Sequence, residues 1–163
     1  MVKKKIAIYP GTFDPITLGH VNIVQKASEM FDEVVMAIAV DNYKDTYFTL
    51  EERTDLCRKA ISHIKNARAE SFSGLVVDFA KSLDTNVMIR GLRAVSDFEY
   101  ELQLALMNKK LSSEIETIFL VPSFEYLYLS SSMVRNIASV HGDVETLVPD
   151  VVAVALQNKI KGE

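Results

Sequence analysis

The feature that most constrains the fold of this chain is an alternation of short apolar runs with stretches of helical spacing. Residues 34–40 form a continuous run of Val, Met, Ala and Ile, which is typical of a strand covered on both faces. Residues 49–52, Thr-Leu-Glu-Glu, have the spacing of a capping box and predict a helix that continues to about Ile64. Strands separated by helices indicate a parallel sheet with right-handed crossovers.

The rest of the chain repeats this alternation. Further strands are predicted over residues 6–9, 67–71, 87–89 and 117–121, and further helices over residues 21–31, 75–83, 97–111, 131–140 and 150–161. Neither an internal repeat nor a linker interrupts the pattern. We therefore predict the α/β class, as a single Rossmann-like doubly wound domain over residues 1–163 with a parallel sheet flanked by helices.

Composition excludes several classes of protein. Hydrophobic residues make up 48% of the chain and charged residues 25%, which is the balance of a globular protein and not of a disordered one. The net charge of −4 leaves no basic excess for a nucleic-acid backbone, so no nucleic-acid partner is expected. The apolar runs are too short to cross a membrane. Cys57 is the single cysteine, which excludes an intrachain disulfide and favours a reducing compartment, so we expect a cytoplasmic protein.

Chemistry in a doubly wound fold is expected in the loops that follow the strands. The first such loop ends in Thr17-Leu18-Gly19-His20 and carries Gly11, where glycine lets backbone approach a ligand, and the hydroxyl of Thr12. At the start of a helix, His20 could donate a hydrogen bond to a phosphate oxygen. It could equally be a histidine that only caps a turn.

Two later segments also offer groups for anions. Arg90-Gly91-Leu92-Arg93 places two guanidinium groups where they could hold a polyphosphate, although a pair of solvated surface arginines would look the same. Ser130-Ser131-Ser132 could bind an anion at a helix start or simply cap the helix. A carboxylate among Asp97, Glu99 and Glu101 could bind a sugar or Mg²⁺, or could be an ordinary acidic residue at a helix start. Tyr126 and Tyr128 could stack on a base or only pack.

Other sites are absent from the sequence. It contains neither a P-loop, nor a dinucleotide fingerprint, nor a Gly-x-Ser-x-Gly elbow. The histidines His20, His63 and His141 are scattered, and nothing has the spacing of a metal-ligand cluster, so no metal site made by protein side chains is predicted.

Taken together, the segments resemble the nucleotidyltransferase α/β-phosphodiesterase superfamily. Its early (H/T)-x-G-H motif stands at residues 17–20, and its late (I/L)-S-S-(S/T)-x-x-(R/K) motif stands at residues 129–135. Tyr-Pro-Gly-Thr-Phe-Asp-Pro at 9–15, Phe-Thr-Leu-Glu-Glu-Arg at 48–53 and Ile-Arg-Gly-Leu-Arg-Ala-Val-Ser-Asp-Phe-Glu-Tyr-Glu at 89–101 make the match closer. Over essentially the whole chain the sequence resembles the bacterial phosphopantetheine adenylyltransferase family.

This resemblance implies a reaction and a set of site residues. The reaction would join ATP and 4′-phosphopantetheine to give dephospho-coenzyme A and pyrophosphate, with Mg²⁺ as cofactor. The catalytic residues implied are His20, Lys44 and Arg93. The residues implied for 4′-phosphopantetheine are Thr12, Lys44, Leu75, Val76 and Arg90. Those implied for ATP are Thr12, Phe13, Gly19, His20, Gly91, Leu92, Arg93, Glu101, Tyr126, Leu127, Tyr128, Leu129, Ser130, Ser131 and Ser132.

The resemblance further suggests a homohexamer built as a dimer of trimers and feedback inhibition by coenzyme A. Two departures stand out: Leu18 replaces a frequent Asn, and Asp45-Thr46 replaces the Lys-Pro that often follows the lysine. Two alternatives remain open at this point. The enzyme could use another phosphate acceptor, such as nicotinamide mononucleotide or glycerol phosphate, or the chain could be a nucleotide sensor without catalysis.

Overall fold

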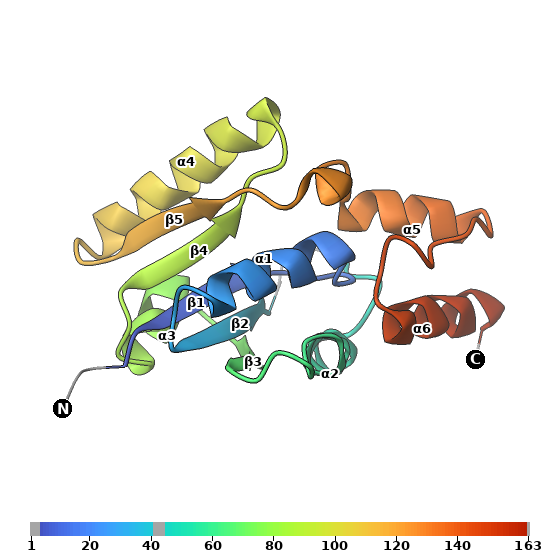
Figure 1. Ribbon diagram of the computed structural model, residues 1–163, viewed down its shortest axis with the longest axis horizontal. Coiled ribbons are helices and arrows are strands. Elements are labelled where there is room, and N and C mark those ends of the chain that lie inside the picture. The colour runs from blue at the N-terminus through green and yellow to red at the C-terminus, as the bar shows by residue number, and fades with distance from the viewer. Residues whose placement is uncertain (1–3, 41–44, 163) are drawn as a thin grey trace.

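A five-stranded parallel sheet organises the chain. The computed structural model describes residues 4–40 and 45–162, and within them the strand order is β3-β2-β1-β4-β5. The strands are β1 (Ile6–Gly11), β2 (Glu33–Ala39), β3 (Ala67–Phe72), β4 (Val87–Gly91) and β5 (Glu116–Leu120). All pairings are parallel, with Ile8 of β1 opposite both Val35 of β2 and Met88 of β4. The predicted α/β class and parallel sheet are confirmed (Figure 1).

Helices cover both faces of this sheet. They are α1 (Leu18–Ser28), α2 (Leu50–Ala60), α3 (Val76–Ser82), α4 (Val95–Leu111), the 3₁₀ turn η1 (Phe124–Tyr126), α5 (Ser131–Ser139) and α6 (Asp150–Lys161). The chain runs outward from β1 to β3 through α1 and α2, then returns through α3 to β4 and through α4 to β5. This reversal leaves β1 and β4 adjacent at the centre of the sheet.

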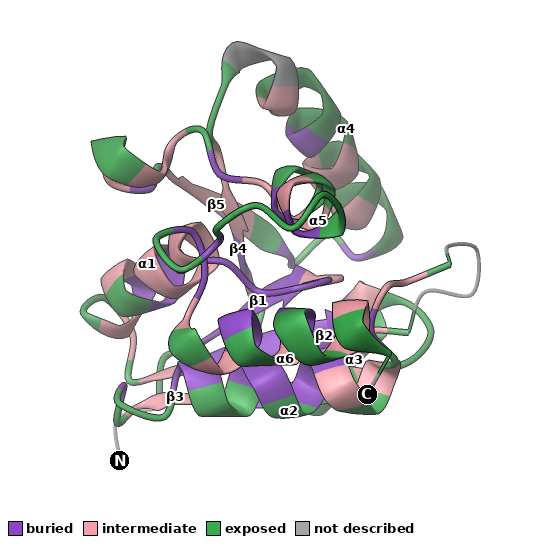
Figure 2. Ribbon diagram, turned by 90° about the vertical axis from the view of Figure 1, so that its right-hand side faces the viewer, coloured by how far each residue is buried: buried purple, intermediate pink, exposed green. Residues whose placement is uncertain are grey.

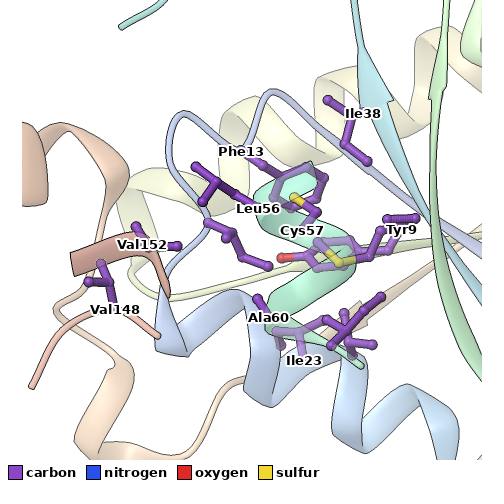
Figure 3. Packing of buried hydrophobic residues seen from close by; sticks show 14 of the residues in the cluster. Tyr9, Phe13, Ile23, Ile38, Leu56, Cys57, Ala60, Val148 and Val152 are labelled. Atoms are coloured by element: carbon purple, nitrogen blue, oxygen red, sulfur yellow. The ribbon is translucent and has the colours of Figure 1, made fainter. Parts of the chain in front are cut away.

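Two apolar clusters hold the layers together. The larger one packs β1 and β2 against α1, α2, α5 and α6; Figure 3 shows Tyr9 of β1 near Cys57 and Ala60 of α2. The smaller one, on the opposite face, joins Ile8 and Met88 to α3. Strands buried on both faces explain the unbroken apolar run of β2. No helix of the described residues is long and apolar enough to span a bilayer.

The element boundaries differ from the predicted ones where capping, rather than apolar spacing, decides them. Helix α1 begins at Leu18 and not at residue 21, because Thr17 caps it with a reciprocal pair of bonds to His20. It ends at Ser28, three residues before the predicted end. Strand β1 continues through Pro10 to Gly11 instead of stopping at Tyr9. The capping box at Thr49 is confirmed, but α2 ends at Ala60 rather than near Ile64.

Candidate active site

A cavity of about 360 Å³ opens above the carboxyl ends of β1 and β4. This is the point where the strand order reverses, and there the loops from neighbouring strands diverge to opposite faces of the sheet. The lining residues come from the ends of β1 and β4, from the loops after β1, β2, β4 and β5, and from helices α1, α4 and α5. They are Tyr9, Pro10, Gly11, Thr12, Phe13, Asp14, Thr17, Gly19, His20, Ile23, Asp45, Thr46, Arg90, Gly91, Arg93, Glu101, Pro122, Tyr126, Leu129, Ser130, Ser131, Ser132 and Arg135.

The loop after β1 turns sharply at Phe13, whose φ of 50° lies in the left-handed region that non-glycine residues rarely adopt. The Phe13 ring meets the rings of Tyr9 and His20 edge-to-face, with centroid distances of 5.3 and 5.1 Å. A Cβ at position 11 would stand 2.9 Å from the Phe13 ring. Gly11 is thus needed for the approach of a protein side chain, whereas we had expected the approach of a ligand.

The first turn of α1 fixes His20 through its spacing of three residues from Thr17. The Thr17 hydroxyl accepts the backbone N–H of His20 at 3.4 Å, and the Thr17 N–H donates to His20 Nδ1 at 2.9 Å. This is a capping box in which histidine takes the place usually held by Glu or Gln. The capping interpretation and the phosphate-donor interpretation of His20 are therefore compatible.

The same bond determines the protonation of the ring. Because Nδ1 accepts a hydrogen bond from the Thr17 N–H, the proton of the neutral imidazole belongs on Nε2. Burial, followed by the charges of Arg93 and Arg90, lowers the pKa of His20 from 6.5 to about 3. At neutral pH the cavity therefore contains a neutral imidazole with an N–H donor.

Arg90, at the end of β4, is held by a bidentate ion pair. Its Nε and Nη2 donate to the two carboxylate oxygens of Glu101 at 2.6 and 2.7 Å, and its Nη1 donates to the carbonyl of Pro10 at 2.7 Å. A guanidinium has five N–H groups, so two remain for a ligand. Glu101 thus serves to hold Arg90, a role that spacing alone did not indicate.

Arg93 follows β4 by two residues and is held in a similar way. Its Nε donates to Asp97 at 3.1 Å, and its Nη1 donates to the carbonyl of Leu129. The second bond ties the loop after β4 to the loop after β5 across the cavity. Both arginines therefore line the cavity, Arg90 half-buried and Arg93 more exposed to solvent.

The start of α5 forms the opposite wall. Ser130 caps the helix by accepting the N–H of Met133 at 3.1 Å, and the Ser131 hydroxyl donates to the carbonyl of Pro15 at 2.8 Å. Arg135 donates to the carbonyl of Asp14 and to the Ser132 hydroxyl. Free N–H groups of a helix start and a nearby guanidinium together favour an anion.

Most of the expected site residues gather at this cavity. Those that line it are Thr12, Phe13, Gly19, His20, Arg90, Gly91, Arg93, Glu101, Tyr126, Leu129, Ser130, Ser131 and Ser132. Leu75 and Val76 lie instead at the start of α3, after edge strand β3, and Leu92, Leu127 and Tyr128 are not among the lining residues. Lys44 lies outside the described residues.

Several lining residues had no place in the expected site. Asp14, Asp45, Thr46 and Pro122 lie in the loops after strands, where chemistry was expected, and Tyr9 and Pro10 lie at the end of β1 just before such a loop, so their positions were a usable signal. Arg135 belonged to the late motif but had no assigned role. Ile23 offered no signal, because its spacing in α1 is that of an ordinary core residue.

The described residues do not build a metal cage of their own, since no group of three or more His, Cys, Asp or Glu side chains is placed to hold an ion. Asp14 accepts the N–H groups of Tyr47 and Phe48 at 2.7 and 2.8 Å, and Glu101 accepts from Arg90. These two cavity carboxylates are therefore already engaged. The donor set suits a Mg²⁺ ion that is bound chiefly by substrate phosphates.

This cavity thus combines neutral donors, helix starts and arginines over the centre of a parallel sheet. Such an arrangement suits a nucleotidyltransferase, because it places donors for phosphate charge above the carboxyl ends of the central strands. Residues 8–137 match the family model described as cytidylyltransferase-like. A solved structure from Vibrio parahaemolyticus, provisionally assigned as a nicotinate-nucleotide adenylyltransferase, shares the fold with a TM-score of 0.73 at 17% identity, over 96% of this chain and 100% of that one.

Curated relatives show which family of nucleotidyltransferases the chain belongs to. The phosphopantetheine adenylyltransferase of Methylacidiphilum infernorum is 53% identical over 158 residues, which cover 96% of this chain and 91% of the relative. That of Moorella thermoacetica is 54% identical over 145 residues, which cover 89% of this chain and 91% of the relative. The chain belongs to the phosphopantetheine adenylyltransferase family.

The lowered pKa of His20 predicts how its charge responds to pH. An unfolded histidine binds a proton near pH 6.5, whereas folded His20 binds one only near pH 3. The difference in pKa therefore contributes to the free energy of unfolding in full above pH 6.5, and this contribution is lost as pH falls toward 3. We expect the ¹⁵N resonances of His20 to remain those of the Nε2–H tautomer at pH 5. The His20→Gln variant identifies the resonances of His20, because they are missing from its spectrum. A His20 ring that becomes cationic between pH 6 and 7 would contradict the prediction.

Proposed function

We propose that this chain transfers AMP from ATP to 4′-phosphopantetheine, giving dephospho-coenzyme A and pyrophosphate in coenzyme A synthesis. The observation that carries this proposal is the neutral, capped His20 facing a cavity walled by Arg90 and Arg93. The names of relatives that are about 50% identical over most of the chain support the same reaction.

The chemistry requires alignment more than proton transfer. The acceptor phosphate is already anionic near neutral pH, so it can attack the α-phosphate of ATP without a general base. The new bond is phosphate oxygen to α-phosphorus, and the bond to the bridging oxygen of pyrophosphate breaks. The protein must hold two repelling anions in line and stabilise the charge that develops between them.

Different residues would stabilise the developing charge and hold the acceptor. His20 Nε2–H would donate to an α-phosphate oxygen as charge builds on it, while Thr12 would orient the attacking phosphate. Arg90, fixed by Glu101, and Lys44 would hold the phosphate of the acceptor, with Leu75 and Val76 toward its pantetheine arm.

The nucleotide would occupy the other side of the cavity. Arg93 and the start of α5 at Ser130–Ser132 would bind the triphosphate, and Tyr126 would lie toward the adenine. Mg²⁺, when bound with ATP, would supply positive charge beside the triphosphate. The engagement of Asp14 and Glu101 by protein donors favours an ion delivered with ATP over one held by the protein alone.

The acceptor is tested by pyrophosphate release with ATP and Mg²⁺ across a panel of phosphate acceptors. We expect turnover with 4′-phosphopantetheine and none above background with nicotinamide mononucleotide or glycerol phosphate. Turnover with a mononucleotide in place of 4′-phosphopantetheine would assign the alternative acceptor class. No turnover with any acceptor, but retained ATP binding, would favour the nucleotide sensor.

Loss of the His20 donor should affect turnover more than folding. His20→Ala is expected to lower kcat at least about a hundredfold, because a preorganised donor to a developing oxyanion contributes roughly that factor or more. His63→Ala is the matched control, since His63 is an exposed histidine outside the cavity. Circular dichroism verifies the fold of both variants. Near-normal turnover by a folded His20→Ala protein would remove His20 from the mechanism.

We also propose that the chain works in the cytoplasm as a homohexamer built as a dimer of trimers, with coenzyme A as a feedback inhibitor. Figure 2 shows exposed residues along α4. Support for association comes from the large apolar side chains that are exposed on this helix. They include Tyr100, Leu106 and Met107, which are 60, 62 and 56% exposed. An apolar surface of this extent is typical of an interface.

A charge on this helix should therefore break the assembly. Leu106→Glu is expected to give a smaller species than the parent in light scattering, because it would bury a carboxylate in an apolar contact. Val140→Glu is the control, since Val140 is 75% exposed but lies at the end of α5. A parent protein that is monomeric at micromolar concentration, or a Leu106→Glu protein of parental size, would contradict the proposed role of α4.

A further inference from the structure

Arg53 is a buried arginine below the cavity that the proposed mechanism does not use. It lies in the first two turns of α2 and is 2% exposed, and it is not one of the cavity-lining residues. Burying a guanidinium is costly unless its N–H groups are satisfied. The identity of its acceptors therefore indicates what the residue holds in place.

The acceptors come from three separate segments. Nη1 of Arg53 donates to the carbonyl of Thr12 at 2.7 Å, in the loop after β1, and to the carbonyl of Ala39 at 3.0 Å, the last residue of β2. Its Nε donates to the carbonyl of Phe48 at 3.3 Å, just before α2. A single side chain thus joins the ends of two adjacent strands to the segment that enters α2.

Asp14 holds the same segment through bonds of the opposite polarity. Its carboxylate accepts the N–H groups of Tyr47 and Phe48, so Phe48 is bound at its N–H by Asp14 and at its carbonyl by Arg53. Asp45 and Thr46, directly before Tyr47, line the cavity opposite the end of β4. The two buried charged groups together set the distance between the Thr12 loop and this part of the cavity wall.

We propose that Arg53 is a positioning residue for the acceptor side of the cavity. It acts through the backbone of Thr12 and of residues 45–48, and it does not touch either substrate. The inference rests on the proposed function, which places the acceptor phosphate near Thr12. Among the residues assigned to ATP, Thr12 and Phe13 share the loop that Arg53 holds, whereas Arg93 and Ser131 are fixed by other bonds, to the carbonyls of Leu129 and Pro15. Loss of Arg53 should therefore weaken acceptor binding and alignment more than ATP binding.

The test compares the two Michaelis constants in variants of Arg53. In Arg53→Met, KM for 4′-phosphopantetheine is expected to rise about tenfold or more and kcat to fall, because displaced backbone misaligns the attacking phosphate. KM for ATP is expected to change by less than about threefold, because most residues assigned to ATP are held by other bonds. A uniform loss of structure would instead raise both KM values. Arg53→Lys should recover part of the loss, because an ammonium can donate to some of these carbonyls but cannot span all three.

Arg58→Met is the matched control. Arg58 lies on the same helix and donates to the carbonyl of Ala69 in β3, away from the cavity, at 3.3 Å. Thermal unfolding reports the stability of all three variants. If Arg53→Met does not fold, the comparison is made in Arg53→Lys. A larger rise in KM for 4′-phosphopantetheine than in KM for ATP then supports the role of Arg53.

The outcomes separate this inference from the function on which it rests. A parent protein without turnover on 4′-phosphopantetheine overturns both. Normal parent turnover, with equal rises in the two KM values or with constants like those of Arg58→Met, overturns the role of Arg53 alone. A selective rise in the acceptor KM that Arg53→Lys partly reverses supports it.

Discussion

The reversal of strand order between β1 and β4 is the constraint on which the site depends. Both strands are central and buried, and their connections leave toward opposite faces of the sheet. The loops that follow β1 and β4 therefore diverge from two adjacent strand ends. Their side chains leave a hollow between them, which is the cavity. Every group assigned to phosphate binding in the described residues follows a strand end or begins a helix at this hollow, so backbone N–H groups and helix dipoles add to the side chains.

Charged side chains around this hollow are held by protein before any substrate arrives. Glu101 and the Pro10 carbonyl fix Arg90, Asp97 and the Leu129 carbonyl fix Arg93, and Asp14 binds two backbone N–H groups. These bonds reduce the freedom that a long side chain would lose on binding, and they space the positive groups at fixed positions. The carboxylates thus act as supports for cations, which explains why acidic residues line a site for anionic substrates.

The sequence was sufficient for the class, and most of the residues that it suggested for the site lie at one cavity. The reasons for its failures are physical. The apolar run of β2 and the capping box at Thr49 are local signals, so both were predicted well. The start of α1 was missed because Thr17 and His20 set it by hydrogen bonds, which apolar periodicity does not record. Arg53 shares a helical face with Leu56, Cys57 and Ala60; an arginine on an apolar face was a signal of a buried role. Its acceptors among the described residues, the carbonyls of Thr12, Ala39 and Phe48, could be known only from the fold.

A neutral histidine suits this chemistry better than a cationic one. The nucleophile needs no proton removed, so a base would have no task, and arginines already supply the positive charge. Those arginines, together with burial, lower the pKa of His20, while the Thr17 N–H fixes its tautomer. The same cations that attract the phosphates thus keep the imidazole uncharged, and the cap directs its remaining proton into the cavity. The hydrogen bond from a neutral donor strengthens as negative charge grows on the phosphate, so it would favour the transition state over the bound substrates.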